Sequence, residues 1–154
     1  MSLITVSSLE RITASKLAEM LLAASASGGE GIAVVDVRDD DHIGGHIRNS
    51  LHFRSNSLDA TMPTLLRKLE DKDTVIFHCA LSQQRGPSAA LRYLREKEAA
   101  VSSGGGTEAT GLGEKKQRQK VYVLDRGFVG WQEVYGTDER LTEGYRKELW
   151  EDGY

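Results

Sequence analysis

Cysteine is nearly absent from this 154-residue sequence, which contains only Cys79. A single cysteine excludes a disulfide within the chain, and a free thiol is typical of proteins from a reducing compartment. Long apolar segments are missing too: no run approaches the ~18 residues of a transmembrane helix, and residues 1–9 show no secretory signal pattern. We therefore expect a protein of the cytoplasm, the nucleus or both, without a membrane as partner.

The sequence also lacks a strong excess of charge of one sign. The formal net charge is −3, although charged residues make up 28% of the chain. Such a balance provides no general attraction to nucleic acid or to anionic membranes. We therefore expect no nucleic-acid partner, and any selectivity for an anion must come from a local site.

The length and the apolar patterning indicate one α/β domain over residues 1–154. Short continuous apolar runs are typical of buried parallel strands, and they occur at residues 32–35, 75–77 and 121–124. Apolar stripes at helical spacing alternate with them, at residues 13–24, 58–70, 87–98 and 141–150. The alternation predicts a mostly parallel sheet flanked by helices.

Residues 100–120 differ in composition from the rest of the chain. The segment is rich in glycine, serine and lysine and has too few apolar side chains to bury a core. We interpret it as a flexible surface insertion. Its basic end, residues 114–120, leaves open a contact with a phosphorylated partner or nucleic acid.

The segment that follows the apolar run Val75–Phe77 carries the chemistry. Cys79 is followed after five residues by Arg85, then by Gly86 and a helical pattern. A loop that leads into a helix turns backbone N–H groups inward, and the helix N-terminus carries partial positive charge, which favours a cysteine thiolate. Arg85 offers a planar fork for two oxygens of a tetrahedral anion, and Gly86 permits close backbone geometry.

This strand, loop and helix predict an oxyanion cradle, which we call the Cys79 loop (residues 79–85). The groups expected to hold the anion are the Arg85 side chain and the amides of Ala80, Leu81, Ser82, Gln83, Gln84 and Arg85. Taken alone, Cys79 could be a small buried residue and Arg85 a solvated helix cap, but neither explains the whole pattern. Strand alternation predicts that the His78 side chain points away from the cradle.

The Cys79 loop resembles a known catalytic loop. His78-Cys79, five residues and Arg85-Gly86-Pro87 are similar to that loop in the cell division cycle 25-type phosphatases, which are built on a rhodanese fold, and in the related eukaryotic arsenate reductases. Within that group, residues 79–83 are most similar to small single-domain fungal and plant members. Two positions depart from the pattern: Ala80 stands where related phosphatases often carry Glu, and Arg126 stands where a second Gly is common.

A second segment resembles rhodanese-like domains more broadly. Such domains have a strand that ends in Asp-x-Arg, then Gly-His-Ile and a short strand, and here these are Asp36-Val37-Arg38, Gly45-His46-Ile47 and residues 50–53. The resemblance spans roughly residues 10–135 and implies a rhodanese-like fold whose sheet has about five strands. It also implies that Asp36 braces the neighbouring loop, while the residues alone leave open an acid role or a solvated carboxylate.

The resemblance implies a cysteine-dependent phosphatase of the tyrosine or dual-specificity type, acting on phosphoproteins. Cys79 would attack phosphorus and form a phosphocysteine that water hydrolyses, and Ser82 could hydrogen-bond the thiolate. No metal or cofactor is expected, because Gly44-Gly45 separates His42 from His46. The candidates for the proton donor are Asp36, Asp39 and Glu133.

Three other functions use the same residues. Arsenate matches phosphate in shape and charge, so Cys79 could act in an arsenate reductase with glutathione or glutaredoxin as the external thiol source. Sulfur transfer is disfavoured, because sulfurtransferases of the fold usually have an active loop one residue shorter. The fourth alternative is a phosphate-binding module without catalysis.

Overall fold

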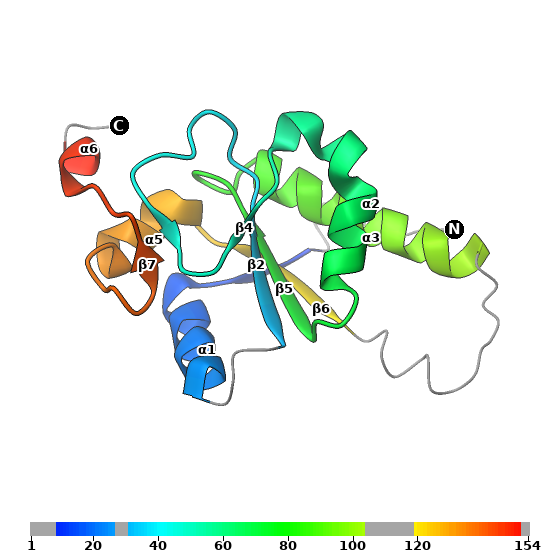
Figure 1. The fold of residues 1–154 in the computed structure, drawn as a ribbon, viewed down its shortest axis with the longest axis horizontal. Coiled ribbons are helices and arrows are strands. Elements are labelled where there is room, and N and C mark those ends of the chain that lie inside the picture. The colour runs from blue at the N-terminus through cyan, green and yellow to red at the C-terminus, as the bar shows by residue number, and fades with distance from the viewer. Residues whose placement is uncertain (1–8, 27–30, 104–118, 152–154) are drawn as a thin grey trace.

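The computed structural model describes residues 9–26, 31–103 and 119–151, and a parallel sheet forms its centre. This five-stranded sheet has the order β1-β6-β5-β2-β4, and every pair in it is parallel. Its strands are β1 (Glu10–Ile12), β2 (Ile32–Asp36), β4 (Leu51–His52), β5 (Thr74–His78) and β6 (Lys120–Leu124). The α/β architecture expected from the sequence is therefore confirmed, and Figure 1 shows the sheet at the middle of the molecule.

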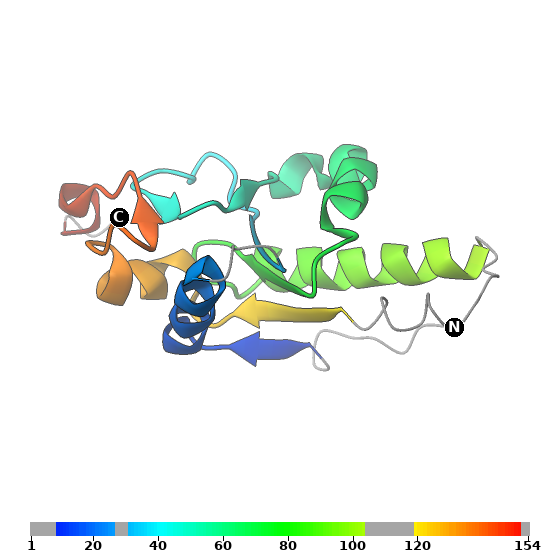
Figure 2. The same cartoon turned by 60° about the horizontal axis from the view of Figure 1, so that its bottom comes forward.

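Helices cover both faces of the sheet, as Figures 1 and 2 show. One face packs against α2 (Leu58–Leu69) and α3 (Arg85–Ser103), and the other against α1 (Ala14–Ala26) and α5 (Gly127–Tyr135). Neighbouring residues of one strand alternate between the two cores: Val35 and Phe77 face α2 and α3, while Val34 and Ile76 face α1 and α5. None of the described helices is long and apolar enough to cross a membrane.

The register of the central strands sets the position of the predicted site. Asp36 pairs with His78 at the carboxyl ends of β2 and β5, and His52 pairs with Asp36 from β4. Because parallel strands end at the same edge, the Asp36 segment and the Cys79 loop lie side by side. This edge is where an α/β sheet usually binds its ligand.

The C-terminal prediction of one helix over residues 141–150 is wrong. Thr142 and Glu143 form the strand β7, which pairs in an antiparallel manner with β3 (His46–Ile47), and the helix α6 is only Lys147–Glu151. The Thr142 hydroxyl accepts a hydrogen bond from the Trp131 indole (2.9 Å) and donates one to the Tyr135 carbonyl (2.7 Å). These contacts with α5 override the helical spacing of the apolar residues.

Trp150 is partly buried. Its indole N–H donates to the Gly44 carbonyl (3.0 Å), and its ring lies 5.6 Å from that of Phe128.

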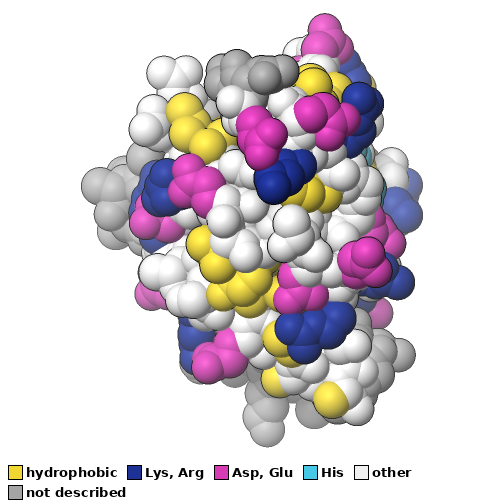
Figure 3. All heavy atoms as spheres, turned by 90° about the vertical axis from the view of Figure 1, so that its left-hand side faces the viewer, with side chains coloured by type: hydrophobic (Ala, Val, Ile, Leu, Met, Phe, Trp, Pro, Cys, Tyr) yellow, Lys and Arg dark blue, Asp and Glu magenta, His cyan; other side chains and the backbone are white. Residues whose placement is uncertain are grey.

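Figure 3 views the side of the molecule that carries α6, where acidic and basic side chains are interspersed around small apolar patches. Among the described side chains in this view, no extended area carries charge of one sign.

The helix after the Cys79 loop is longer than predicted. It was expected over residues 87–98, but α3 spans Arg85–Ser103. The helix therefore includes residues 100–103, the first four of the segment interpreted as an insertion. Strand β6 begins at Lys120, the last residue of that segment. Residues 104–118 lie outside the described residues, so the proposed flexibility of the insertion stays a prediction.

Candidate active site

The Cys79 loop surrounds the cysteine sulfur with backbone amides. The Cys79 side chain is buried, and its Sγ accepts hydrogen bonds from the N–H groups of Ser82 (3.2 Å) and Gly86 (3.3 Å). Gly86 belongs to the first turn of α3, so the sulfur lies at the positive end of this helix. The sulfur therefore faces two amide donors and the start of a helix.

Ser82 shapes the loop in a way that the sequence did not indicate. Its φ is 58°, in the left-handed region, and its hydroxyl oxygen accepts a hydrogen bond from the Cys79 N–H (3.4 Å). The sequence suggested that the Ser82 hydroxyl would hydrogen-bond the sulfur. In the structure the Ser82 backbone makes that contact, and the hydroxyl closes the turn.

Two elements distant in sequence hold the loop from outside. The N–H groups of Phe128 and Val129, at the start of α5, donate to the carbonyls of Cys79 (3.0 Å) and Ala80 (2.9 Å). Arg11 of β1 donates from Nη2 to the Ser82 carbonyl (3.0 Å) and from Nη1 to Asp125 (3.3 Å). Sequence analysis missed Arg11, because nothing near it in the sequence marks it as functional.

Two glycines let the backbones approach closely at this point. A Cβ on Gly127, whose φ is +54°, would lie 2.5 Å from the carbonyl oxygens of both Cys79 and Ala80. A Cβ on Gly86 would lie 3.3 Å from the His78 Cα. Gly86 was predicted from its place in the motif, and the steric need for a glycine at position 127 comes from the contact between the start of α5 and the loop.

Arg85 makes a bidentate ion pair with a residue absent from the predicted site. Its Nη1 and Nη2 donate to the two carboxylate oxygens of Asp41, at 2.8 Å and 2.6 Å, and Nη1 also donates to Asp39 (3.2 Å). The pairing raises the pKa of Arg85 and lowers the pKa of Asp41 to about 2. Burial alone would raise the pKa of Asp39, but hydrogen bonds from Ser55, Asn56 and Arg85 lower it.

Asp36 is fully buried and paired with an equally buried arginine. Its carboxylate binds Nε and Nη2 of Arg38, with the shortest distance 2.7 Å, and Arg38 continues to the Gly45 carbonyl (2.9 Å). Burial by itself would raise the pKa of Asp36, but His78 and Arg38 hold it below its usual range. The geometry fits the bracing role and leaves Asp36 ionised.

His78 lies on the α5 side of the sheet, while Cys79 packs in the core on the α3 side. Its ring is 6.3 Å from that of Phe128, and its Nδ1 is 3.0 Å from the Cys79 carbonyl. Among the buried side-chain polar atoms of the described residues, only His78 Nε2 lacks a hydrogen bond, and it faces Asp36 Oδ2 at 3.7 Å. Burial lowers the pKa of His78, and the Asp36 carboxylate and the Cys79 carbonyl oppose that shift in part.

The remaining candidates lie outside this cluster. Arg126, which stands where related proteins often carry a second Gly, pairs with Glu133 (3.0 Å) on the exposed surface of α5. Glu133 was a candidate proton donor, and this pairing does not bring it into the Cys79 loop. His42 stacks on His52 with centroids 3.8 Å apart, and within the described ranges no three potential ligands are grouped to hold a metal ion.

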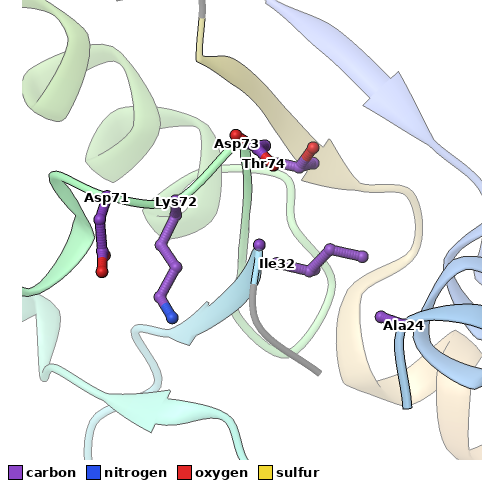
Figure 4. Close-up of a pocket in the computed structure, with 7 residues that line it drawn as sticks. Ala24, Ile32, Asp71, Lys72, Asp73 and Thr74 are labelled. Carbon is purple, nitrogen blue, oxygen red and sulfur yellow. The ribbon is translucent and has the colours of Figure 1, made fainter. Parts of the chain in front are cut away.

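Cavities lie at both ends of the sheet. One cavity, of about 730 Å³, lies at the amino ends of β2 and β5, where Ile32 and residues 71–74 line it (Figure 4). A smaller groove of about 350 Å³ lies beside Arg85, lined also by Ser55, Leu58, Asp59, Gln84, Ser88, Ala89 and Arg92. The smaller groove is therefore the one that adjoins the Cys79 loop.

Comparison with curated proteins finds phosphatases and arsenate reductases. The chain is 40% identical to the "CDC25-like phosphatase YCH1" of Saccharomyces cerevisiae, over 79% of each protein. It is 43% identical to the "Dual specificity phosphatase Cdc25" of Arabidopsis thaliana and 40% identical to the "Arsenate reductase 2.1" of Oryza sativa. These two matches cover 66% and 72% of this chain, and the chain spans 62% of the length of each of these plant proteins.

Solved structures give the same grouping. The yeast protein Ygr203w, described as a protein tyrosine phosphatase of the rhodanese family, aligns with a TM-score of 0.69 and 34% identity, over 96% of this chain and 99% of that one. The As-Sb reductase of Leishmania major aligns with a TM-score of 0.60 and 27% identity, over 87% and 84%. The family model for the rhodanese-like domain matches residues 13–134. This chain therefore belongs to the rhodanese-like domain family.

Proposed function

We propose that this chain is a cysteine-dependent phosphatase of the tyrosine or dual-specificity type. The observation that carries the proposal is the position of Cys79 Sγ, which accepts two backbone N–H groups at the N-terminus of α3 beside Arg85. Relatives named as phosphatases support the same activity. A cysteine sulfur buried in an ordinary hydrophobic core would not accept two backbone N–H hydrogen bonds in this way.

The loop offers further donors for a bound anion. Within the described part of the chain, the backbone N–H groups of residues 80, 81, 83, 84 and 85 donate no hydrogen bonds. Successive free amides around a concavity form an anion-binding nest. These amides and Arg85 would hold the three equatorial oxygens of a phosphoryl group and stabilise charge in the transition state.

The reaction has two steps in this site. The Cys79 thiolate attacks phosphorus in line, the bond from phosphorus to the leaving oxygen breaks, and a phosphocysteine forms. Water then attacks phosphorus and the thiolate leaves, stabilised by the Ser82 and Gly86 amides. No metal or cofactor enters either step.

None of the three candidate carboxyl groups is placed to donate a proton to the leaving group. Asp36 is ion-paired with Arg38, Asp39 with Arg85, and Glu133 with Arg126. The pairings of Asp36 and Asp39 favour the ionised carboxylate, which has no proton to give, and Glu133 lies on the exposed surface of α5. We therefore propose that the enzyme hydrolyses activated aryl phosphates well and poor leaving groups slowly.

Arsenate reduction is the second candidate, favoured by the single cysteine in a tetrahedral-anion cradle and by relatives named as arsenate reductases. Cys79 would displace hydroxide from arsenate to form a thiol–arsenic bond. An external thiol such as glutathione would attack the Cys79 sulfur, which releases arsenite and leaves a mixed disulfide for a second thiol or glutaredoxin to reduce. The two electrons thus come from Cys79 and the external thiol.

Paired kinetics on one preparation test these proposals. One assay follows release of p-nitrophenol from p-nitrophenyl phosphate, and the other follows glutathione-dependent arsenate reduction. Cys79→Ser is the control, because it keeps the size of the side chain and removes the thiolate. Turnover in only one assay, abolished in Cys79→Ser, assigns the enzyme. No turnover in either assay, with phosphate still bound, would leave a binding module and refute both enzymes.

The physiological substrate class that we propose is a phosphoprotein, or arsenate for the second activity. The location that we propose is the cytoplasm or the nucleus, because a thiolate catalyst needs a reducing compartment. Localisation of a tagged full-length chain and of Cys79→Ser would test the location independently of the activity.

A further inference from the structure

Asp41 holds one edge of the Arg85 guanidinium. Its two carboxylate oxygens pair with Nη1 and Nη2 in an end-on fork, at 2.8 Å and 2.6 Å. The side chain of Asp41 is 25% exposed and that of Arg85 is 33% exposed, so the pair is largely shielded from water. Neither the family resemblance nor any motif in the sequence marks Asp41 for a role.

The donors of Arg85 can be assigned one by one. A guanidinium has five N–H donors in a plane. Asp41 takes one from each Nη, and Asp39 takes the second one on Nη1. The donors left are Nε–H and the second N–H of Nη2, which lie on one common edge. Within the described part of the chain this edge makes no hydrogen bond, and it has the spacing to bind two oxygens of a tetrahedral anion.

The acidic residues are themselves fixed. Asp41 Oδ1 accepts the Asp39 N–H (2.8 Å), and the Asp39 carboxylate accepts the Ser55 hydroxyl (2.6 Å) and the Asn56 N–H (3.0 Å). The following residues are anchored too, because Arg38 binds the Gly45 carbonyl (2.9 Å). The carboxylates therefore form a rigid clamp on a long side chain that would otherwise sample many rotamers.

We propose that Asp41 is a positioning residue, whose carboxylate fixes the end of the Arg85 guanidinium so that its Nε–Nη2 edge is presented to the oxyanion in the Cys79 loop. The inference rests on the proposed function, since it assigns a task to Asp41 in the same reaction. The anion and Asp41 bind different edges of one cation, so the substrate does not have to displace the carboxylate. The second carboxylate, Asp39, supports the clamp from Nη1.

Competition between Asp41 and the anion, and positioning of Arg85 by Asp41, predict opposite effects of neutralising Asp41. If Asp41 competed with the anion for the same donors, neutralising it would strengthen anion binding and raise kcat/KM. If it positions Arg85, neutralising it releases the guanidinium and weakens both. Misplacing a reacting group by about 1 Å costs on the order of 100-fold in rate. We therefore expect Asp41→Asn to lower kcat/KM by about 10- to 100-fold, mostly through kcat.

The experiment compares Asp41→Asn with a matched control, Asp40→Asn. Asp40 is the adjacent residue with the same charge, but its side chain is 97% exposed and pairs with Arg54 rather than Arg85. Both variants lose one negative charge from the same segment. We expect Asp40→Asn to stay within about twofold of the wild type, and Asp41→Glu to recover part of the activity. In an Arg85→Lys background, Asp41→Asn should have little further effect, as expected of coupled residues.

Binding of inorganic phosphate, measured by isothermal titration calorimetry, separates this inference from the proposed function. Thermal unfolding first establishes that each variant is folded. Weaker phosphate binding in Asp41→Asn than in Asp40→Asn supports the inference, even if the wild type turns over neither substrate. Equal or tighter binding, or kinetics that match Asp40→Asn, would overturn it. A wild type that binds no phosphate would overturn the inference and the proposed function together.

Discussion

Gly127 is the position where a single methyl group should disturb the Cys79 loop most. Its φ of +54° lies in the left-handed region, and an added Cβ would lie 2.5 Å from the carbonyl oxygens of Cys79 and Ala80. Both are backbone atoms, so no side chain can move aside. Gly127→Ala must push the loop away from α5 or rotate the start of α5.

The cost of Gly127→Ala can be summed from its parts. A left-handed conformation costs an alanine about 1–2 kcal/mol. The steric overlap adds about 1–3 kcal/mol. The hydrogen bonds from Phe128 and Val129 to the loop carbonyls, each contributing about 1 kcal/mol, would be weakened by the same displacement. We expect a loss of about 3–5 kcal/mol in the free energy of unfolding, and a fall of at least about 100-fold in kcat.

Gly144→Ala is the matched control. Gly144 has a φ of +67°, but the nearest atom to an added Cβ is 3.9 Å away. It therefore carries the conformational cost without the steric one, and we expect about 1–2 kcal/mol with unchanged kcat. Urea denaturation and p-nitrophenyl phosphate kinetics measure both variants. Equal losses of stability in the two variants, with normal turnover in Gly127→Ala, would refute the argument that α5 supports the loop.

Three further predictions follow from the same contacts. Arg11→Gln removes the donor to the Ser82 carbonyl, so we expect kcat on p-nitrophenyl phosphate to fall about 10-fold with little change in thermal stability; unchanged kcat would count against a bracing contact. Asp41 has a folded-state pKa of about 2, below its unfolded value near 4, so its contribution to stability is present above about pH 4 and is lost as the pH falls through about 2. Urea denaturation between pH 5 and pH 2 should show this loss of stability in the wild type and a smaller loss in Asp41→Asn, and identical profiles would exclude the contribution of Asp41. Because the three candidate carboxylates in the described part of the chain are ion-paired, and a poised acid contributes about 100- to 10,000-fold, kcat/KM should fall at least about 100-fold from p-nitrophenyl phosphate to phenyl phosphate, whereas equal values would reveal a proton donor.

The sequence by itself determined the features whose causes are local. Continuous apolar runs predicted β2, β5 and β6, because strands buried on both faces need apolar residues throughout. The spacing from Cys79 to Arg85 and Gly86 predicted a loop leading into a helix, and the sulfur does lie at the N-terminus of α3. These predictions succeeded because hydrophobic periodicity and loop chemistry act over a few neighbouring residues.

Tertiary structure alone decided which distant residues support that loop. Arg11 and Asp41 lie 71 and 44 residues along the chain from their partners in the loop, and nothing in their own surroundings marks them. The same reason explains why the predicted helix over residues 141–150 became β7 and α6. Its apolar spacing fits a helix, but pairing with β3 and the Thr142 hydrogen bonds to α5 are contacts that a local pattern does not contain. The residues that form the Cys79 loop therefore lie in one short segment of the sequence. The distant residues that hold the loop in shape are brought together only by the packing of the sheet and its helices.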